Sequence, residues 1–446
     1  MIRRLSLAIG AALLGASSTA LGITDIETNS SVPFSFLNPG ARSLGMGSAF
    51  VGLADDATAA YTNPAGLTQL VQPEFSIEGR HTNISEAYVN GGSATLDPFD
   101  LSRLNHSDAK SSKTNPSFIA FVWPHDNFAL AFYRHEVSRF STKLQSSGAD
   151  LADDPTQPGV INEVLLPFNG STNLRIVNYS TAAALKLNDV LSVGVGVSYY
   201  TFNYSATRDQ FDNVSFAPPI VSGTVSDSGS DHALGATFGL RARFNDQWSA
   251  GFAYRLTPQF SYRETSTFFE GTDASGNPVL IPGGFPPTQL DNVHLKVPEV
   301  YSLGVSYRPM EPLVINFDID YVRYAQITDH MQSSFSFSDP TTSLDRLRIP
   351  NGTELHLGGE YTFGNMAHPL SLRAGVWRDP RHTISFDGTP VDSDGLVEAA
   401  DFAGGAGGKM HYSAGLGMAF KTFQIDAAAD ISSKIDTYSI SAIYRF

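Results

Sequence analysis

The feature that most limits the fold is a long region of alternating apolar and polar residues, which begins at Phe75 and continues to Phe446. The stretch 313–324 is typical. Its apolar residues fall on one face of an extended strand, and its acidic residues, Asp318 and Asp320, fall on the other. A period of two residues predicts β-strands that separate an apolar environment from a polar one.

Fourteen such strands are expected, joined alternately by tight turns and by long loops. Many are roughly 11–15 residues long, whereas strands of soluble proteins are usually about 5–6 residues long. Short turns at one end and long loops at the other are typical of an exported barrel. The predicted fold class is therefore all-β, a transmembrane 14-stranded antiparallel β-barrel with an N-terminal plug of short helices and loops. The expected strands are 75–85, 117–124, 127–139, 174–187, 190–204, 233–244, 248–262, 293–308, 313–324, 353–363, 369–378, 411–420, 423–431 and 438–446.

The acidic faces of these strands predict an enclosed interior. A carboxylate that faces lipid is costly, so the acidic faces are expected to point into the barrel. A soluble β-sandwich produces the same alternation with its apolar face inward, but the strand lengths and the aromatic residues at strand ends favour the barrel. The polar residues expected in the lumen are Arg80, Arg241, Arg243, Arg255, Asp318, Asp320 and Arg373, together with Glu78, Arg175, His356, Glu360, Asp426 and Asp430.

The first residues have the pattern of a signal peptide, expected at 1–22. Arg3 and Arg4 precede an apolar run, 5–14, that is too short to span a bilayer as a helix. An uncleaved anchor is the alternative. The chain has no Cys, which excludes disulfides and a lipoprotein anchor, and its formal charge of −15 does not indicate nucleic-acid binding. We expect a Gram-negative outer-membrane protein with both termini in the periplasm.

The stretch 38–70 lacks the two-residue period and is rich in Gly and Ala. It is expected to form a plug, or hatch, over residues 23–74, inside a barrel of residues 75–446. Asp55 and Asp56 can cap a short helix that runs to Tyr61. Pro64 forces Asn63 towards an extended conformation and can begin a second short helix. The alternative is a Gly-rich loop packed on a sheet.

Three of the long loops contain apolar runs, and a contiguous exposed apolar patch usually marks a binding surface. The alternative, which is compatible with the first, is that the runs pack against one another. The lumenal arginines also have two open roles, because they can meet a ligand carboxylate or pair with lumenal acids and the plug backbone. The apolar residues expected to bind ligand are Val164, Leu165, Leu166, Phe168, Phe216, Ile220, Phe268, Phe269, Leu280, Ile281 and Phe285.

The motif Asn63-Pro64-Ala65, just after an Asp-Asp-Ala helix start, resembles the long-chain fatty-acid transporter family of outer membranes, the FadL/TodX type. The strand 438–446, which ends on a Phe, resembles the signal that the barrel-assembly machinery reads. The resemblance implies a monomeric barrel in outer-membrane lipid, ligand capture by the long loops, and sideways exit at a kinked third strand. That kink lies near Gly in the family. Here the third strand contains no Gly, so a kink requires the segment 134–136 to bulge inward.

The predicted function is passive transport of hydrophobic small molecules, either long-chain fatty acids or aromatic hydrocarbons, past the plug. The alternative is a secretion-associated barrel that presents protein partners at the cell surface. No enzyme activity, cofactor or metal is expected. The stretch 403–410 lacks the Ser or Thr of a phosphate-binding loop, 196–200 lacks the last Gly of a nucleophile elbow, and the 11 His have no metal-ligand spacing. A lipase assembled from separate strands stays open.

Overall fold

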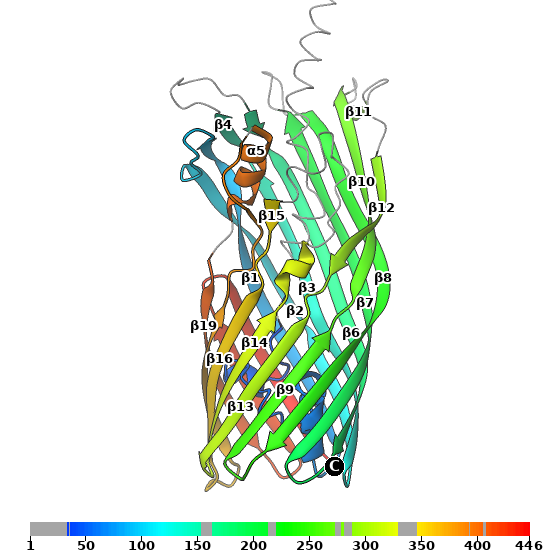
Figure 1. Ribbon diagram of the computed structural model, residues 1–446, viewed down its shortest axis with the longest axis vertical. Coiled ribbons are helices and arrows are strands. Elements are labelled where there is room, and N and C mark those ends of the chain that lie inside the picture. The colour runs from blue at the N-terminus through cyan, green and yellow to red at the C-terminus, as the bar shows by residue number, and fades with distance from the viewer. Residues whose placement is uncertain are drawn as a thin grey trace, which may run out of the picture.

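One antiparallel ladder of backbone hydrogen bonds runs around the molecule and closes on itself. In the computed structural model, the first barrel strand, β1 (Glu74–Thr95), pairs with the last, β21 (Ile435–Arg445), from Glu74–Arg445 to Ile84–Ile435. The closed ladder forms a tall barrel (Figure 1). The structure describes residues 34, 36–152, 163–212, 220–272, 278–280, 288–328, 346–391, 393–404 and 407–446.

The predicted 14-stranded antiparallel barrel is confirmed, and each expected strand is present. Two of the fourteen are interrupted, so that β9 continues as β10 and β12 continues as β13. Between β1 and β21 the barrel strands are β2 (Leu104–His125), β3 (Phe128–Ser146), β6 (Phe168–Lys186), β7 (Leu191–Asp212), β8 (Ile220–Arg243), β9 (Trp248–Leu256), β10 (Gln259–Thr272), β12 (Thr288–Lys296), β13 (Val300–Met310), β14 (Leu313–Val322), β16 (Gly352–Phe363), β17 (Leu370–Asp379), β19 (Lys409–Ala419) and β20 (Phe423–Ile431).

Several strands extend well beyond their predicted limits at the end of the barrel that carries the long loops. Residues 86–116 were expected to form a loop, yet β1 and β2 have 22 residues each and remain paired as far as Gly92 and Leu104. These extensions are rich in Ser, Gly and Asn and have no clear apolar face. The ladder itself holds them, because backbone hydrogen bonds do not depend on side-chain pattern.

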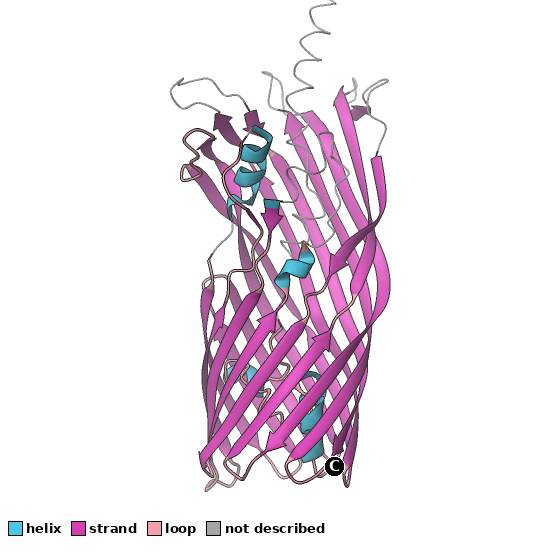
Figure 2. Cartoon of the chain, in the orientation of Figure 1, coloured by secondary structure: helices cyan, strands magenta, loops and turns pink. Residues whose placement is uncertain are grey.

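Smaller elements cover the long-loop end (Figure 2). Among the described residues, no helix is long and apolar enough to cross a membrane. The smaller elements are β4 (Ala149–Ala152), β5 (Glu163–Leu165), β11 (Pro278–Leu280), β15 (Leu347–Arg348), β18 (Ser385–Phe386), the 3-10 helices η2 (Tyr324–Ile327) and η4 (Phe402–Gly404), and the helix α5 (Ser393–Asp401).

The two faces of the barrel wall differ as predicted. Large apolar residues such as Phe132, Tyr179 and Leu234 are half or more exposed on the outer face. The acidic residues of β14 and β20 lie inside, where Asp318 and Asp426 are at most 1% exposed. The barrel therefore presents an apolar surface to its surroundings and encloses its charges.

Residues 36–73, which we call the plug, lie inside the barrel at the short-turn end, except for the exposed Val71 and Gln72, and Figure 1 draws them in blue. They form α3 (Ala41–Gly45), α4 (Ala59–Thr62) and the 3-10 helix η1 (Pro64–Gln69). Asp56 supports the turn before α4, since its Oδ1 accepts hydrogen bonds from the amide and hydroxyl of Thr58 at 2.9 and 2.5 Å.

Asn63 joins the two plug helices in the manner expected of a residue that precedes proline. Its backbone is extended, with φ −154° and ψ 98°, and its side chain accepts a hydrogen bond from the Ala65 amide. Pro64 is the first residue of η1, where its missing N–H costs nothing. The expected helix towards Tyr61 is shorter than predicted, because α4 begins only at Ala59.

The plug backbone touches the wall directly at glycines. A Cβ placed on Gly358 would overlap the Met46 carbonyl, and one placed on Gly375 would overlap the Gly47 amide. The absence of a side chain is therefore a requirement at these positions. The wall glycines that approach the plug in this way are Gly194, Gly239, Gly251, Gly304, Gly358, Gly375 and Gly415.

A side chain at one of these glycines should destabilise the plug. We expect Gly358→Val to lower the stability of the folded barrel by about 1–3 kcal/mol or more, because the added atoms meet backbone that cannot move aside. The measurement is the thermal unfolding midpoint in detergent. Gly364→Val is the matched control, since a Cβ there meets nothing within 4 Å. Equal midpoints for the two variants would contradict the close approach.

Candidate functional site

The Asn63-Pro64-Ala65 motif attaches the plug to the barrel wall. Asn63 is fully buried, and its Nδ2 donates to the Val51 carbonyl at 3.1 Å and to the Leu240 carbonyl at 2.9 Å. Val51 belongs to the plug and Leu240 to β8. One amide side chain therefore satisfies two buried carbonyls, one on each side of the interface.

On the opposite side, an ionic network joins the plug to β16, β17 and β20. Arg42 Nη1 lies 2.6 Å from Asp55 Oδ1, and Arg42 Nη2 lies 2.8 Å from Glu360 Oε1. Glu360 is also 2.6 Å from Arg373, which in turn is 2.8 Å from Asp426. The charges alternate in sign from the plug into the wall, so each buried ion has a partner.

Burial and this network act in opposite directions on the plug charges. Burial alone would lower the pKa of Arg42, but Asp55, Glu360 and Asp56 outweigh it and raise that pKa well above its usual value. Burial raises the pKa of Asp56, and Arg42 partly offsets this effect. Arg42 therefore stays charged and is the cation on which the surrounding carboxylates depend.

Asp318 provides a third attachment. Its Oδ2 accepts hydrogen bonds from the backbone amides of Phe50 and Val51, at 2.6 and 2.7 Å. These amides have no role in a helix or strand, so the wall carboxylate replaces the partners that regular structure would supply.

The other predicted lumenal residues are divided between interior and surface. Arg80 lies inside, 2.7 Å from Glu78 and 2.6 Å from the Asn38 carbonyl, and Arg241 is buried. Arg243 instead lies largely exposed at the end of β8, where it pairs with the exposed Asp246 at 2.6 Å. Arg175 also differs from the expectation. Its neighbours Leu174 and Ile176 point inward, so Arg175 faces outward.

Beyond the plug, towards the long-loop end, the interior contains a buried apolar group that is rich in aromatic rings. The Phe202 and Phe260 rings stack at 4.8 Å, and the Tyr204 and Tyr262 rings meet edge to face at 5.0 Å. We call the buried residues gathered here the interior cluster. They are Phe34, Phe36, Ile84, Val137, Phe140, Leu174, Ile176, Tyr200, Phe202, Tyr204, Ala206, Phe260, Tyr262, Val293, Leu295, Val297, Val300, Val322, Tyr324, Ile327, Leu347, Ile349 and Ile384.

The sequence prediction did not identify this cluster, although β7 contains a signal for it. The inward face of β7 carries Gly194 beside the plug, but it changes to Tyr200, Phe202 and Tyr204 farther along the strand. An inner face that changes from small to aromatic residues along one strand indicates two environments, one filled by the plug and one apolar.

A set of polar groups surrounds the Tyr61 ring between the plug and the interior cluster. The Arg255 guanidinium lies over this ring, 4.5 Å from its centroid, and the His135 ring is 4.3 Å away. Arg255 is 3% exposed and donates to Asn38 Oδ1 at 3.3 Å. Within the described chain, Arg255 Nε and Nη1, His135 Nδ1 and the Tyr133 hydroxyl have no hydrogen-bond partner. The arrangement offers donors to an anionic or polar group.

The wall beside this polar set is interrupted between β2 and β3. Their described pairing ends at Phe118–His135, although both strands continue. At the same height, the pairing of β3 with β6 shifts between Glu136 and Ser138, which marks a bulge at Val137. The third strand therefore bends without a glycine.

Side-chain interactions are found where β2 and β3 no longer share backbone hydrogen bonds. The Arg134 guanidinium donates to the Pro116 carbonyl and pairs with Glu136 at 2.8 Å. Arg175 lies 3.3 Å from the same carboxylate. Pro116 has no N–H, so β2 loses no donor at this point.

The predicted ligand-binding residues of the loops fall into three groups. Leu165 and Leu166 are buried in an apolar group with Leu151 and α5, and Val164 packs against it. Phe168 is buried under the Arg208 guanidinium, 3.5 Å from its ring centroid. For the remaining residues, the structure places Ile220 in β8, Phe268 and Phe269 in β10 and Leu280 in β11, whereas Phe216, Ile281 and Phe285 lie outside the described residues.

Removing the central plug cation should loosen the plug. We expect Arg42→Met to destabilise the folded protein by about 3–5 kcal/mol, because the carboxylates of Asp56 and Glu360 are left buried with one cationic partner fewer. The measurements are the thermal midpoint in detergent and the ion conductance of single barrels in a planar bilayer.

Arg243→Met is the control for this prediction, since its partner Asp246 is exposed and the pair is open to solvent. Its midpoint and conductance should match those of the unmodified chain. A comparable loss in both variants would show that burial of the network is irrelevant.

Known proteins resemble this chain in sequence and in fold. Outer membrane protein P1 of Haemophilus influenzae is 22% identical over 409 residues, which cover 82% of this chain and 78% of that protein. The structure of a Pseudomonas aeruginosa FadL homologue matches with a TM-score of 0.63 at 17% identity, over 93% of this chain and 99% of the other. The P. putida toluene transporter TodX gives a TM-score of 0.59 at 14% identity, over 92% of this chain and 99% of that one.

A further structure, the Ralstonia pickettii toluene transporter TbuX, has a TM-score of 0.57 at 16% identity and covers 92% of this chain and 99% of its own. At these identities the structures establish a shared fold. The family model described as "Outer membrane protein transport protein (OMPP1/FadL/TodX)" matches residues 166–431, which is more than half of the sequence. The chain therefore belongs to the OMPP1/FadL/TodX family of outer-membrane transport proteins.

Proposed function

We propose that this protein carries long-chain fatty acids or aromatic hydrocarbons passively across the outer membrane. The observation that carries the proposal is the interior cluster, an aromatic-rich apolar region placed between the plug and the long loops. An enclosed apolar region of this kind suits a ligand with little polar surface. Two of the structural relatives are described as toluene transporters, and a third as a FadL homologue.

The energetics of burial favour such a ligand and require a second state for its release. Each buried CH₂ contributes roughly 0.8 kcal/mol, so a chain of ~16 carbons gains on the order of 12 kcal/mol before the costs of binding. A rigid pocket would hold that ligand for a long time. Movement of the plug supplies the second state, and the differential affinity of its two positions sets the direction of release.

The wall interruption beside β3 is the proposed exit. The bulge at Val137 and the end of pairing at Phe118–His135 leave β2 and β3 without a shared ladder next to the interior cluster, to which Val137 belongs. A hydrophobic molecule that leaves there enters the lipid directly and avoids water. No energy source is needed, since partition into the bilayer is favourable.

In this proposal the long loops face outward from the cell and make the first contact with ligand. Both termini lie in the periplasm, and the barrel-assembly machinery reads β21 and Phe446. The short turns and the C-terminus share one end of the barrel (Figure 1), which agrees with insertion in that direction.

Substitution of Arg255 can show which of the two ligand classes the protein binds. A fatty-acid carboxylate would receive donors from the unpartnered Arg255 nitrogens, whereas a hydrocarbon would not use them. Hydrogen bonds to charged groups contribute roughly 1.5–3 kcal/mol. We therefore expect Arg255→Met to weaken fatty-acid binding at least about tenfold and to leave hydrocarbon binding unchanged, as measured by displacement of a fluorescent fatty acid from the purified protein.

Arg243→Met again provides the control, because that guanidinium lies outside the interior. If Arg255→Met leaves the affinity for fatty acids intact, the carboxylate role is wrong. If no lipid or hydrocarbon binds to the unmodified protein, the transport proposal fails and a barrel that presents protein partners becomes the better explanation.

Deletion of Val137 tests the exit. Removing this one residue restores a regular register between β3 and β6 and allows β3 to continue its ladder with β2. We expect uptake of a radiolabelled ligand by intact cells to fall at least about tenfold, with binding to the purified protein retained. Val137→Ala keeps the bulge and should transport normally. Undiminished uptake by the folded deletion variant would rule out exit at this position.

A further inference from the structure

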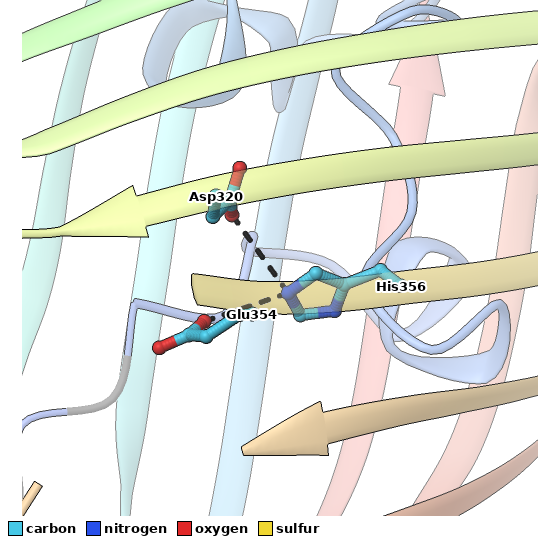
Figure 3. A group of neighbouring side chains, drawn as sticks. All are labelled: Asp320, Glu354 and His356. Carbon is cyan, nitrogen blue, oxygen red and sulfur yellow. Dashed lines mark ion pairs between the residues drawn. The ribbon is translucent and has the colours of Figure 1, made fainter. Parts of the chain in front are cut away.

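Three side chains with metal-ligating atoms converge on the inner wall beside the plug (Figure 3). Asp320 of β14 lies opposite Glu354 of β16 in the ladder, and His356 follows two residues after Glu354. Residues two apart on a strand share a face, so all three side chains project into the barrel. Each is at most 4% exposed.

The distances within this group suit a small cation. His356 Nε2 lies 3.4 Å from Glu354 Oε2 and 3.8 Å from Asp320 Oδ2. One ligand atom from each residue falls within 4.8 Å of the other two. Ligand atoms around a tetrahedral Zn²⁺ stand roughly 3.3–3.5 Å apart, given bonds of about 2.0–2.2 Å. The His–Glu distance already meets this requirement, and the His–Asp distance of 3.8 Å is only slightly longer.

The plug sets which nitrogen of His356 is available. His356 Nδ1 lies 2.7 Å from the Gly47 carbonyl oxygen, which only accepts hydrogen bonds, so Nδ1 carries the hydrogen. In the neutral ring, Nε2 therefore directs a lone pair towards the two carboxylates. Within the described residues, neither Nε2 nor Asp320 Oδ1 has a hydrogen-bond partner. A lone pair and two negative groups buried together require a positive charge between them.

We propose that Asp320, Glu354 and His356 bind a divalent transition-metal ion, with Zn²⁺ as the representative, at the interface between plug and barrel. One imidazole nitrogen and two carboxylate oxygens form a three-residue donor set of the kind that zinc accepts, with a water as a fourth ligand. This site adjoins the interior cluster, to which Tyr324 belongs, but the metal proposal does not depend on the proposed ligand path.

Neighbouring groups orient the ligands as they do in metal sites. The Tyr324 hydroxyl donates to Glu354 Oε1 at 2.9 Å, and the Trp377 ring stacks on His356 with centroids 5.1 Å apart. The Gly47 carbonyl holds the ring from the other side. Such outer partners fix ligand orientation and strengthen binding. Because ligation polarises the ring and strengthens its Nδ1–H donor, a bound ion also tightens the plug contact at Gly47.

The test uses the full-length protein in detergent after chelation of bound metals. Isothermal titration with ZnCl₂ should give one saturable site per chain, and saturation should raise the thermal midpoint. His356→Gln and Asp320→Asn should each weaken Zn²⁺ binding at least about a hundredfold and abolish the rise. His411→Gln is the matched control. That histidine is equally buried and lies 2.7 Å from Asp430, but among the residues that the structure describes it belongs to no group of three ligands.

X-ray absorption spectroscopy of Zn²⁺ bound to the unmodified protein supplies a readout that does not require the variants to fold. One nitrogen with the scattering pattern of imidazole and two or three oxygens would support the site. An oxygen-only shell, the absence of a saturable site, or retained binding in His356→Gln would overturn it. A midpoint that rises on acidification and not with Zn²⁺ would also overturn it, because a proton on His356 would then be the missing positive charge.

Discussion

The structure depends on one constraint of the bilayer, which offers no hydrogen-bond partner to a backbone amide or carbonyl. Closing the sheet between β1 and β21 satisfies the backbone of the wall, and it also creates an interior that must be filled. The interruption between β2 and β3 is compatible with this constraint for chemical reasons. Pro116 has no N–H to satisfy, and the Arg134 guanidinium donates to its carbonyl. At Pro116, where β2 separates from β3, the backbone therefore leaves neither an unpaired donor nor an unpaired carbonyl.

Different groups fill the interior at different heights along the barrel: the plug at the short-turn end, and aromatic side chains farther along. At the short-turn end, the plug occupies the barrel so closely that wall positions such as Gly358 must lack a side chain. Its charges are paired with those of the wall, as Arg42 is with Glu360. Farther along, strands of the wall carry aromatic rings such as Phe202 and Phe260. The apolar interior cluster thus lies next to a polar layer that includes Arg255.

Much of the fold was predictable, because lipid on one side and an enclosed interior on the other impose a two-residue period. That period identified all fourteen strands and the inward direction of Asp318 and Asp426. It could not show where a strand continues above the membrane, since neither face of β1 beyond residue 85 needs to be apolar. Residues 86–116, which end on Pro116, were expected to form a loop. Proline is also tolerated in a strand that lacks a neighbour on one side, which is its position here.

The candidate sites were less predictable because they depend on neighbours that are distant in sequence. The spacing of histidines along the sequence does not reveal the group of Asp320, Glu354 and His356. These residues become adjacent only through the pairing of β14 with β16. Arg175 was expected in the lumen, but it lies between the inward-pointing Leu174 and Ile176 and therefore faces outward. Arg243 was expected there as well, but it stands at the end of its strand, where its side chain reaches solvent. Alternation predicts whether a side chain points into the barrel or outward, but it does not predict how deeply that side chain is buried.

The plug is held by two kinds of contact, which lie on different sides of it. Towards β13–β20 the contacts are ionic pairs and hydrogen bonds, which are directional and strong when buried, as at Arg42 and Asp318. Towards β2, β3 and β6 the plug helices meet alanines of the wall, among them Ala131 and Ala182. Apolar contacts between small side chains have no preferred direction, so surfaces of this kind can slide with little loss. The apolar side of the plug is the one next to the interrupted wall, where the exit proposed above would have to form.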